Sequence, residues 1–465
     1  MLHLFSNLKK FNHKIALIDK NKKSYSYKEV IKKSNFICSN VENKSVILMI
    51  ASNTIPSIIG YIGFIREKNI VILLDKSFKQ EYAEETIKKY KPNYIFYPDG
   101  YIKNKNYNKI LSFKNYSLIK TNFKKIKKLN KKNLLLLSTS GTTQSPKFVR
   151  LSNINLKVNT NSIINYLKIN SKHTTITTMP MGYSYGLSII NTHLESGAKI
   201  IVNEKTIFEK GFWKNIINYK VTSFGGVPQI FEQLKKLKFE SLNLPNLKYL
   251  TQAGGKLEEN LVSYYKNICA KKSIKFFIMY GQTEASPRMS YLEWKKFSTK
   301  SASIGKPLNG SKFEIINNKK KRVKKPFEIG ELKYFGKNVS LGYAKDIIDL
   351  YKDDQNLGEL LTGDLGYFDD EGYFYITGRK NRITKVFGLR INLDDIEKKL
   401  KKYKINVKCV PDNKYLKIQV SKKINIRQIK KIIFESYSIN QDYVLIAKVK
   451  KFRNFNNFKK IKNIN

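Results

Sequence analysis

Four consecutive leucines, residues 134–137, lead directly into a loop of small hydroxyl residues around one glycine. The apolar run predicts a buried strand. The residues that follow it are Ser138, Thr139, Ser140, Gly141, Thr142 and Thr143, and the loop closes with Pro146 and Lys147. Backbone N–H groups and hydroxyls of such a loop can surround phosphate oxygens, and a lysine adds a positive charge. The spacing is not that of a Walker A loop. An ordinary Ser/Thr-rich turn is the alternative, so this stretch alone predicts only a candidate phosphate site.

Short apolar runs alternate with amphipathic stretches before this loop and again after it. We expect strands at residues 14–19, 46–50, 71–74, 94–97, 199–202, 221–225, 247–254 and 275–280. We expect helices at residues 27–40, 55–65, 80–89, 154–166, 208–218, 228–237 and 258–266. This order predicts an α/β fold with a mostly parallel sheet covered by helices on both faces. Ligands of open α/β sheets bind beyond the carboxyl ends of the strands, which is where the loop lies.

The pattern changes after residue 303, where short strands are separated by Gly, Asn and Asp turns. This change predicts an antiparallel piece appended to the α/β body. A boundary near residues 378–381 separates it from a small part with strand, helix, strand, helix, strand character. We therefore expect a large domain over residues 1–379 and a small α+β domain over residues 380–465.

The formal net charge is +52, from 88 Lys+Arg against 36 Asp+Glu. Such a charge is typical of nucleic-acid-binding proteins, but the lysines are spread evenly and mixed with asparagine and isoleucine. We therefore favour a coding bias and expect no specific nucleic-acid partner. The three cysteines are isolated, which argues against a disulfide framework and a zinc site. No apolar run is long enough to span a bilayer, and we expect a cytoplasmic protein.

Three further motifs carry polar side chains suited to nucleotide chemistry. Tyr280, Gly281, Gln282, Thr283 and Glu284 follow a strand, and a carboxylate there can hold Mg²⁺ against nucleotide phosphates. Asp364 in the turn TGD can accept hydrogen bonds from ribose hydroxyls, and Arg379 is the second residue of the segment GRKNRITKVFGLRI. Taken alone, the first motif is better explained as a polar loop, TGD is a frequent turn tripeptide, and the third is explained by a basic turn that leads into a charged helix.

Together the four motifs, in this order, resemble the AMP-forming acyl-CoA synthetases, peptide-synthetase adenylation domains and luciferases, which form the adenylate-forming (ANL) superfamily. The loop resembles the signature T-S-G-[ST]-T-G-x-P-K-G, with Gln144 and Phe148 where that signature has glycine. The resemblance implies a large N-terminal domain and a small mobile C-terminal lid that pivots at Asn381. It also implies ATP-dependent activation of a carboxylic acid, release of pyrophosphate, and transfer of the acyl group to a thiol.

The resemblance implies roles for individual residues. The loop, Lys147 and Mg²⁺ on Glu284 would handle the phosphates, with Thr283 contacting one of them. Tyr280 and the turn Gly254-Gly255-Lys256 would frame the adenine, while Asp364 and Arg379 would hold the ribose or phosphate. Gly388 would line the channel for the thiol of coenzyme A or of the phosphopantetheine on an acyl carrier protein. The catalytic lysine of the family falls on Lys459, with Lys460 as the alternative.

Candidate pocket residues for the acid are Tyr183, Phe224 and Gly225. Ser184 stands where amino-acid-activating members carry an aspartate, so an α-ammonium group would lack a partner in the pocket. An uncharged small or fatty acid is therefore expected. The alternatives are a paralogue that binds adenylate or acyl ligands without turnover and, with less support, a basic nucleic-acid-binding protein.

Overall fold

The computed structural model describes residues 3–102, 107–126, 128–139, 146–317, 319–380, 383–386, 389–412, 414–420 and 425–449, with backbone alone at 383, 385, 390, 392, 394 and 398. The chain divides into two compact units. The first contains Met1–Ser138, Pro146–Thr362 and Gly366–Ile376, and the second contains Thr139–Ser145, Gly363–Leu365 and Thr377–Asn465. The domain limits at 379 and 380 stay a prediction.

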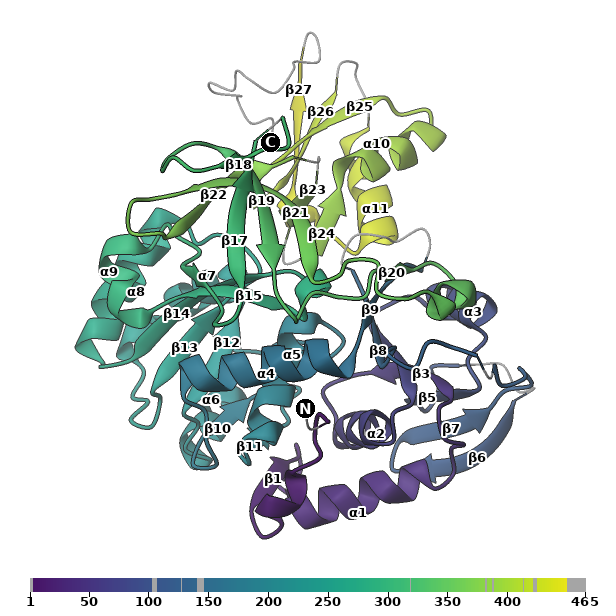
Figure 1. The fold of residues 1–465 in the computed structure, drawn as a ribbon. Coiled ribbons are helices and arrows are strands. Elements are labelled where there is room, and N and C mark those ends of the chain that lie inside the picture. The colour runs from purple at the N-terminus through teal and green to yellow at the C-terminus, as the bar shows by residue number, and fades with distance from the viewer. Residues whose placement is uncertain are drawn as a thin grey trace. The chain divides into compact units, whose positions relative to one another are not determined.

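The first large sheet of unit 1 has eight strands in the order β20-β9-β8-β4-β3-β5-β7-β6 (Figure 1). Its centre is parallel and consists of β8 (Leu135–Ser138), β4 (Ile70–Asp75), β3 (Val46–Ala51) and β5 (Tyr94–Pro98). Its edges are antiparallel and consist of β20 (Tyr343–Ala344), β9 (Phe148–Leu151), β7 (Tyr116–Lys120) and β6 (Asn108–Phe113). The sequence predicted the four central strands, because strands buried on both faces read as continuous apolar runs.

The second large sheet has nine strands in the order β16-β15-β14-β13-β12-β10-β11-β1-β2. Its parallel strands are β14 (Lys275–Gly281), β13 (Tyr249–Gln252), β12 (Ser223–Gly226), β10 (Thr174–Ile176), β11 (Lys199–Ile201) and β1 (Ile15–Ile18). Antiparallel strands end it on both sides, namely β15 (Arg288–Leu292), β16 (Lys306–Pro307) and β2 (Ser24–Ser26). The α/β class is thus confirmed, with two large mixed sheets.

Eight helices of eight or more residues belong to the described part of unit 1. They are α1 (Tyr27–Cys38), α2 (Ile55–Arg66), α3 (Gln80–Tyr90), α4 (Asn153–Leu167), α5 (Ser184–Glu195), α6 (Lys210–Asn218), α7 (Pro228–Lys236) and α8 (Glu259–Lys271). Ser26 and Glu29 form a capping box at the start of α1, and Ser152 and Asn155 do the same for α4. These reciprocal bonds satisfy N–H groups that the first turn of a helix leaves without partners.

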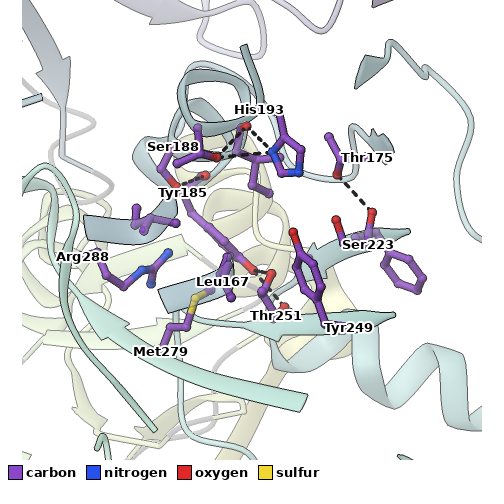
Figure 2. Close-up of a pocket in the computed structure, with 15 residues that line it drawn as sticks. Leu167, Thr175, Tyr185, Ser188, His193, Ser223, Tyr249, Thr251, Met279 and Arg288 are labelled. Carbon is purple, nitrogen blue, oxygen red and sulfur yellow. Dashed lines mark hydrogen bonds between the residues drawn. The ribbon is translucent and has the colours of Figure 1, made fainter. Parts of the chain in front are cut away.

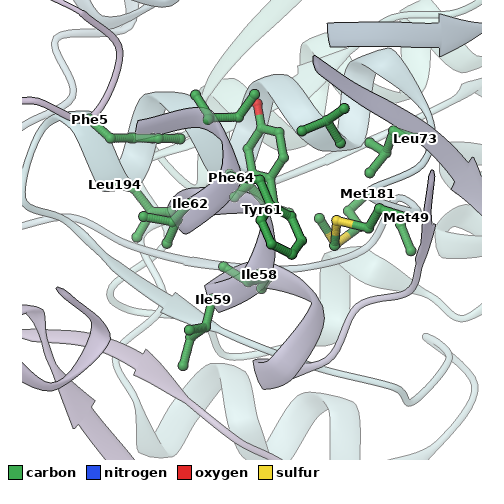
Figure 3. Close-up of a cluster of buried hydrophobic side chains, with 14 of the residues drawn as sticks. Phe5, Met49, Ile58, Ile59, Tyr61, Ile62, Phe64, Leu73, Met181 and Leu194 are labelled. Carbon is green, nitrogen blue, oxygen red and sulfur yellow. The ribbon is translucent and has the colours of Figure 1, made fainter. Parts of the chain in front are cut away.

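Helix α2 is apolar on every side and every residue from Ile55 to Ile65 is buried, as expected for a helix inside a protein core. Figure 3 shows Tyr61, Phe64 and their neighbours packed against Met49 and Leu73 of the first sheet and against Leu194 of α5. One continuous apolar cluster therefore joins the first sheet to the helices α1, α4 and α5.

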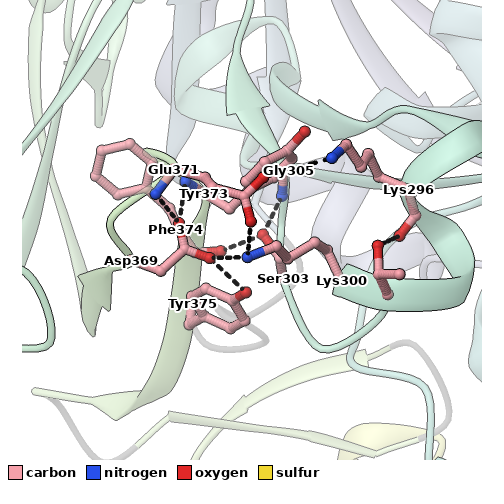
Figure 4. Close-up of polar contacts among 10 residues, drawn as sticks. Lys296, Lys300, Ser303, Gly305, Asp369, Glu371, Tyr373, Phe374 and Tyr375 are labelled. Atoms are coloured by element: carbon pink, nitrogen blue, oxygen red, sulfur yellow. Dashed lines mark hydrogen bonds and ion pairs between the residues drawn. The ribbon is translucent and has the colours of Figure 1, made fainter.

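The antiparallel piece is a five-stranded sheet in the order β18-β17-β19-β21-β22, formed by β18 (Arg322–Val323), β17 (Lys312–Ile316), β19 (Gly330–Phe335), β21 (Glu359–Phe368) and β22 (Phe374–Arg379). The turn between β21 and β22 is fastened to the short helix α9 (Phe297–Lys300). Lys300 pairs with Asp369 at 2.8 Å and Glu371 at 2.6 Å, and the hydroxyl of Tyr375 donates to Asp369 (Figure 4).

Unit 2 contains a hairpin of β23 (Ile383–Val386) and β24 (Leu389–Asn392), then α10 (Leu393–Lys402) and α11 (Ile426–Tyr437) around a three-stranded sheet. That sheet is formed by β25 (Val407–Val410), β26 (Leu416–Val420) and β27 (Val444–Lys448), with β25 antiparallel and β27 parallel to β26. The helices and strands share their own apolar cluster. Across the described residues of both units, no helix is long and apolar enough to cross a membrane.

Candidate functional site

The predicted phosphate loop joins two antiparallel strands. Strand β8 ends at Ser138 and β9 begins at Phe148, and these two residues are paired in register. Strand β9 (Phe148–Leu151) was not predicted from the sequence. Phe148, which stands where the loop signature has glycine, is fully buried and packs edge-on against the ring of Tyr90 at 5.2 Å. Thr139 is half-buried; Ser140, Gly141, Thr142, Thr143 and Gln144 lie outside the described residues.

Lys147 lies directly before β9, and its ammonium group contacts an aromatic ring. Its Nζ is 3.5 Å from the ring centroid of Tyr343, whose strand β20 pairs with β9. The hydroxyl of Tyr343 donates a hydrogen bond to Oε1 of Glu284 at 2.8 Å. Tyr343 thus links the predicted phosphate lysine to the predicted metal carboxylate, and we call these three residues the Lys147 cluster.

The Lys147 cluster holds a cation and a carboxylate close together in a partly dry setting. Burial lowers the pKa of Lys147, and the charge of Glu284 opposes this shift. The cation–π contact with Tyr343 favours the ammonium form as well. Tyr343 therefore holds Lys147 at a defined position. Its positive charge could be paired with the negative charge of nucleotide phosphates.

Glu284 has the features of a residue that holds Mg²⁺ with few other protein ligands. It belongs to the short helix η3 (Thr283–Ala285), is 5% exposed, and its Oε2 atom has no hydrogen-bond partner. Mg²⁺ commonly binds one or two carboxylates, water and the phosphates of a nucleotide. Within the described residues there is no group of three or more His, Cys, Asp or Glu that could hold a metal by itself. The donor set therefore fits a magnesium ion shared with a nucleotide.

The residues next to Glu284 are tied to neighbouring elements. The hydroxyls of Thr283 and Ser184 are 3.2 Å apart, which connects η3 to the start of α5. Gln282 donates from Nε2 to the carbonyl of Thr362 at 2.9 Å. Tyr280 and Gly281 are half-buried at the end of β14, and the Tyr280 ring lies 6.2 Å from that of Phe313. The YGQTE segment is thus placed at the carboxyl end of a parallel strand, as predicted.

The glycine turn predicted to frame the adenine follows β13. Gly254 has a φ of +87°, which side chains other than glycine rarely adopt. Its position lies close to the hydroxyl of Tyr183 and to the side chain of Val227. Gln252 donates from Nε2 to the carbonyl of Gly255 at 2.7 Å, and Lys256 is exposed. Tyr183 and the glycine turn therefore come together.

Asp364 and Arg379 form an ion pair in unit 2, with Nε of Arg379 2.6 Å from Oδ1 of Asp364. Asp364 is buried, and the Nη1 atom of Arg379 has no partner. The two residues that the resemblance assigns to the ribose or phosphate thus lie side by side. Gly388, Lys459, Lys460 and the hinge residue Asn381 lie outside the described residues.

Phe224 and Gly225 line a narrow cavity in unit 1, which we call the β12–β13 cavity (Figure 2). About 320 Å³ of its volume is not filled by atoms, part of this being open solvent, and it has room for only about one free water molecule. Its wall is formed by residues of α4, α5, β10, β12, β13, β14 and β15, and Tyr183 is not among them. Gly225 is required here because a Cβ atom would collide with the hydroxyl of Tyr185.

Two residues of the Lys147 cluster and of the β12–β13 cavity were not predicted from the sequence. Tyr343 completes the Lys147 cluster, and Arg288 lines the β12–β13 cavity. Arg288 stands four residues after Glu284 and begins the strand RMSYL. Its position next to the Glu284 motif could have marked it as a candidate site residue. Tyr343 carried no local signal, because its partners are 59 and 196 positions away.

The model of the family described as AMP-binding enzyme matches residues 4–344. The chain belongs to the AMP-binding enzyme family. The predicted membership is thereby confirmed, and with it the prediction that the chain comes from a family of enzymes. The matched range contains the Lys147 cluster, the glycine turn and the β12–β13 cavity.

Curated relatives of this AMP-binding enzyme are named as CoA ligases. Oxalate–CoA ligase from Arabidopsis thaliana is 27% identical over 268 residues, which cover 57% of this chain and 51% of that protein. 2-Succinylbenzoate–CoA ligase from Oceanobacillus iheyensis is 30% identical over 263 residues, which cover 56% and 52%. The chain therefore spans about half the length of the curated relatives it matches.

A solved structure has the same fold. The o-succinylbenzoate CoA synthetase of Bacillus subtilis, bound with its product analogue, matches with a TM-score of 0.75 over 97% of this chain and 94% of that one. The two are 18% identical in sequence. This likeness confirms the predicted fold, a large α/β part followed by a small α+β part.

Proposed function

We propose that this AMP-binding enzyme is an acid–thiol ligase that activates a small carboxylic acid with ATP. A carboxylate oxygen attacks the α-phosphorus, an O–P bond forms, the bond to the β-phosphate breaks, and pyrophosphate leaves. The thiol of coenzyme A or of phosphopantetheine on a carrier protein then attacks the carbonyl carbon of the acyl-adenylate, and AMP leaves with the carbon–oxygen bond electrons. The observation that carries this proposal is the Lys147 cluster.

The Lys147 cluster supplies what phosphoryl-type chemistry needs from a protein, which is mainly position and charge neutralisation. Lys147 neutralises negative charge on the phosphates and is held in place by the ring of Tyr343. Glu284 keeps one carboxylate oxygen without a partner for Mg²⁺. When bound, Mg²⁺ withdraws charge from the phosphate oxygens and orients the leaving pyrophosphate.

Other residues in this proposal contact the adenine, the ribose, the leaving group and the thiol. Tyr280, Gly281 and the turn Gly254–Lys256 frame the adenine, Thr283 contacts a phosphate, and the loop Thr139–Thr143 surrounds the leaving group. Asp364 accepts from the ribose hydroxyls, with Arg379 beside it. Lys459 neutralises the reacting carboxylate, and Gly388 lines the thiol path. The relatives named as CoA ligases support coenzyme A as the acceptor.

The proposal is tested by ATP–pyrophosphate exchange with a panel of short and long acids, followed by thioester formation with coenzyme A or a phosphopantetheinylated carrier protein. We expect acid-dependent exchange in wild type. A folded protein that binds ATP but exchanges with no acid would show a binding paralogue and refute the proposal.

Two matched pairs of variants test the roles of single residues. Lys147→Ala and Glu284→Gln should each reduce exchange at least 100-fold, which corresponds to about 2.8 kcal/mol of lost transition-state stabilisation. Lys337→Ala and Glu293→Gln change an exposed lysine and an exposed glutamate and should leave the rate unchanged. Equal rates within either pair would remove the assigned role.

A further inference from the structure

Arg288 is a buried arginine that lines the β12–β13 cavity. It is the first residue of β15, is 2% exposed, and its side chain lies beside the ring of Tyr185, with 5.2 Å between the guanidinium carbon and the ring centroid (Figure 2). Its Nε atom has no hydrogen-bond partner. No aspartate or glutamate of the described residues forms an ion pair with it. The charge is therefore inside the protein without a compensating carboxylate.

Arg150, which is also fully buried, shows how this chain satisfies such a group when its role is structural. Arg150 is 0% exposed, and its two terminal nitrogens donate to the carbonyls of Leu341, Lys352 and Asp353 and to Oε1 of Gln355, at 2.7 to 3.2 Å. These acceptors all come from the segment 341–355, while the Nε atom of Arg150, like that of Arg288, has no partner. Within the described part of the chain, Arg288 has no comparable set of carbonyl acceptors.

The aromatic neighbours of Arg288 cannot neutralise it. Burial raises the pKa of Tyr166 to about 12 and raises the pKa of Tyr185, and in both cases the charge of Arg288 opposes the shift. Both phenols are therefore neutral at physiological pH. The cation–π contact with Tyr185 contributes about 2 kcal/mol at most when desolvated, whereas a buried, unpaired ion costs several kcal/mol. An anion from outside the chain would offset the difference.

Polar groups also face the rest of the cavity. Its wall includes the hydroxyls of Thr175, Ser188, Ser223, Tyr249 and Thr251. His193 is neutral because burial lowers its pKa to about 4, and its Nδ1 lies 2.8 Å from the carbonyl of Ile189. A carbonyl only accepts hydrogen bonds, so Nδ1 carries the proton and Nε2, which has no partner, is an acceptor. The hydroxyls of Thr175, Ser188 and Thr251 already have partners within the chain. Ser223 Oγ, Tyr249 OH and His193 Nε2 have none, and a fatty chain would leave these three without partners.

We propose that Arg288 is a specificity-determining residue that pairs with a second carboxylate on the acid, so that the substrate is a short dicarboxylic acid. This inference rests on the proposed function, and it replaces the expectation of an uncharged or fatty acyl group. A carboxylate is larger than the one water molecule for which the cavity has room, so side chains of its wall must move aside, and only a short acid fits. The guanidinium matches a carboxylate because its fork of donors forms paired hydrogen bonds with two oxygens.

The test compares length-matched acids in ATP–pyrophosphate exchange: malonate with propionate, succinate with butyrate, and glutarate with valerate. In wild type, at least one diacid should exceed its partner by 50-fold or more in kcat/KM. Arg288→Met should abolish that preference, because kcat/KM for the diacid should fall at least 50-fold relative to kcat/KM for the monocarboxylic acid. Arg322→Met, at an arginine that is exposed on β18, should keep the preference.

Different results separate the inference from the proposed function. Exchange with monocarboxylic acids as good as with diacids, or an unchanged preference in Arg288→Met, would overturn the inference and leave the proposed function standing. If no acid supports exchange, calorimetric binding of the same diacids decides: binding to wild type that is lost in Arg288→Met supports the inference, and equal or absent binding overturns it. Arg288→Lys, which keeps the charge, covers the case in which Arg288→Met does not fold and should retain the preference in weaker form.

Discussion

Tyr343→Phe removes one hydroxyl from the centre of the Lys147 cluster and leaves the aromatic ring in place. The hydroxyl donates to Oε1 of Glu284 at 2.8 Å, and the ring lies against Nζ of Lys147. The substitution therefore separates the two contacts of one side chain. Glu284 would keep its burial but lose the hydrogen bond that orients it.

The size of the effect follows from the kind of bond that is lost. A hydrogen bond to a charged group contributes about 1.5–3 kcal/mol, and about 1.4 kcal/mol corresponds to a factor of ten. We therefore expect kcat/KM in pyrophosphate exchange to fall about 10- to 100-fold. Because Glu284 is the proposed ligand of Mg²⁺, the Mg²⁺ concentration for half-maximal rate should rise in the same variant.

The assay is exchange at saturating acid, with Mg²⁺ and ATP titrated separately. Tyr343→Ala should lose more activity than Tyr343→Phe, by the further 0.5–2 kcal/mol or so of a cation–π contact. Tyr351→Phe, at an exposed tyrosine, is the control and should match wild type. If Tyr343→Phe keeps both the wild-type rate and the wild-type Mg²⁺ dependence, Tyr343 does not orient Glu284 and the reasoning fails.

Three other substitutions have definite expected outcomes. Burial lowers the pKa of His193 from 6.5 to about 4, so the unfolded chain binds the extra proton and stability should fall by about 3 kcal/mol as pH drops from 6.5 to 4. Urea unfolding at pH 7.5 and 5.0 should show a smaller loss in His193→Gln, and an equal loss contradicts this. Lys157→Met leaves Glu195 buried without its ion pair, so the free energy of unfolding measured in urea should fall by about 3–5 kcal/mol. A variant that also carries Glu195→Gln should recover part of this loss. A loss below about 1 kcal/mol in the single variant would be inconsistent with a buried pair. Gly225→Ala places a Cβ against the hydroxyl of Tyr185 and 2.6 Å from Oγ1 of Thr251. The rate of acid activation should therefore fall at least tenfold, while the ATP affinity measured by calorimetry stays within twofold. Unchanged kinetics with the acid would place the acyl site elsewhere.

The strands at the centre of the first sheet were predictable because their residues are buried on both faces. Residues 46–50, 71–74 and 94–97 read as apolar runs and correspond to β3, β4 and β5. The hairpin β6–β7 was missed because β6 is largely exposed and has no apolar pattern. Strand β9 was missed because it contains Arg150, whose acceptors come from residues 341–355.

The motif residues were predictable where their chemistry is local to a strand end. Glu284, Thr283 and Lys147 were identified from short segments, and the structure places them at the ends of β14 and β9. Their relation to each other was not predictable, because Tyr343 connects Lys147 and Glu284 from a strand of two residues in another part of the chain.

The sequence alone was enough to predict the order of the central strands, the turn at Gly254 and the positions of the charged motif residues. Each of these features depends on neighbours a few residues away. The pairing of buried charges depends on which distant segments fold against each side chain. Arg150 and Arg288 are the same residue type with nearly the same burial. One is surrounded by carbonyl oxygens and the other lines a cavity beside an aromatic ring. Only the tertiary structure separates the two, because hydrogen-bond acceptors 190 or more positions away decide whether a buried guanidinium is satisfied within the chain.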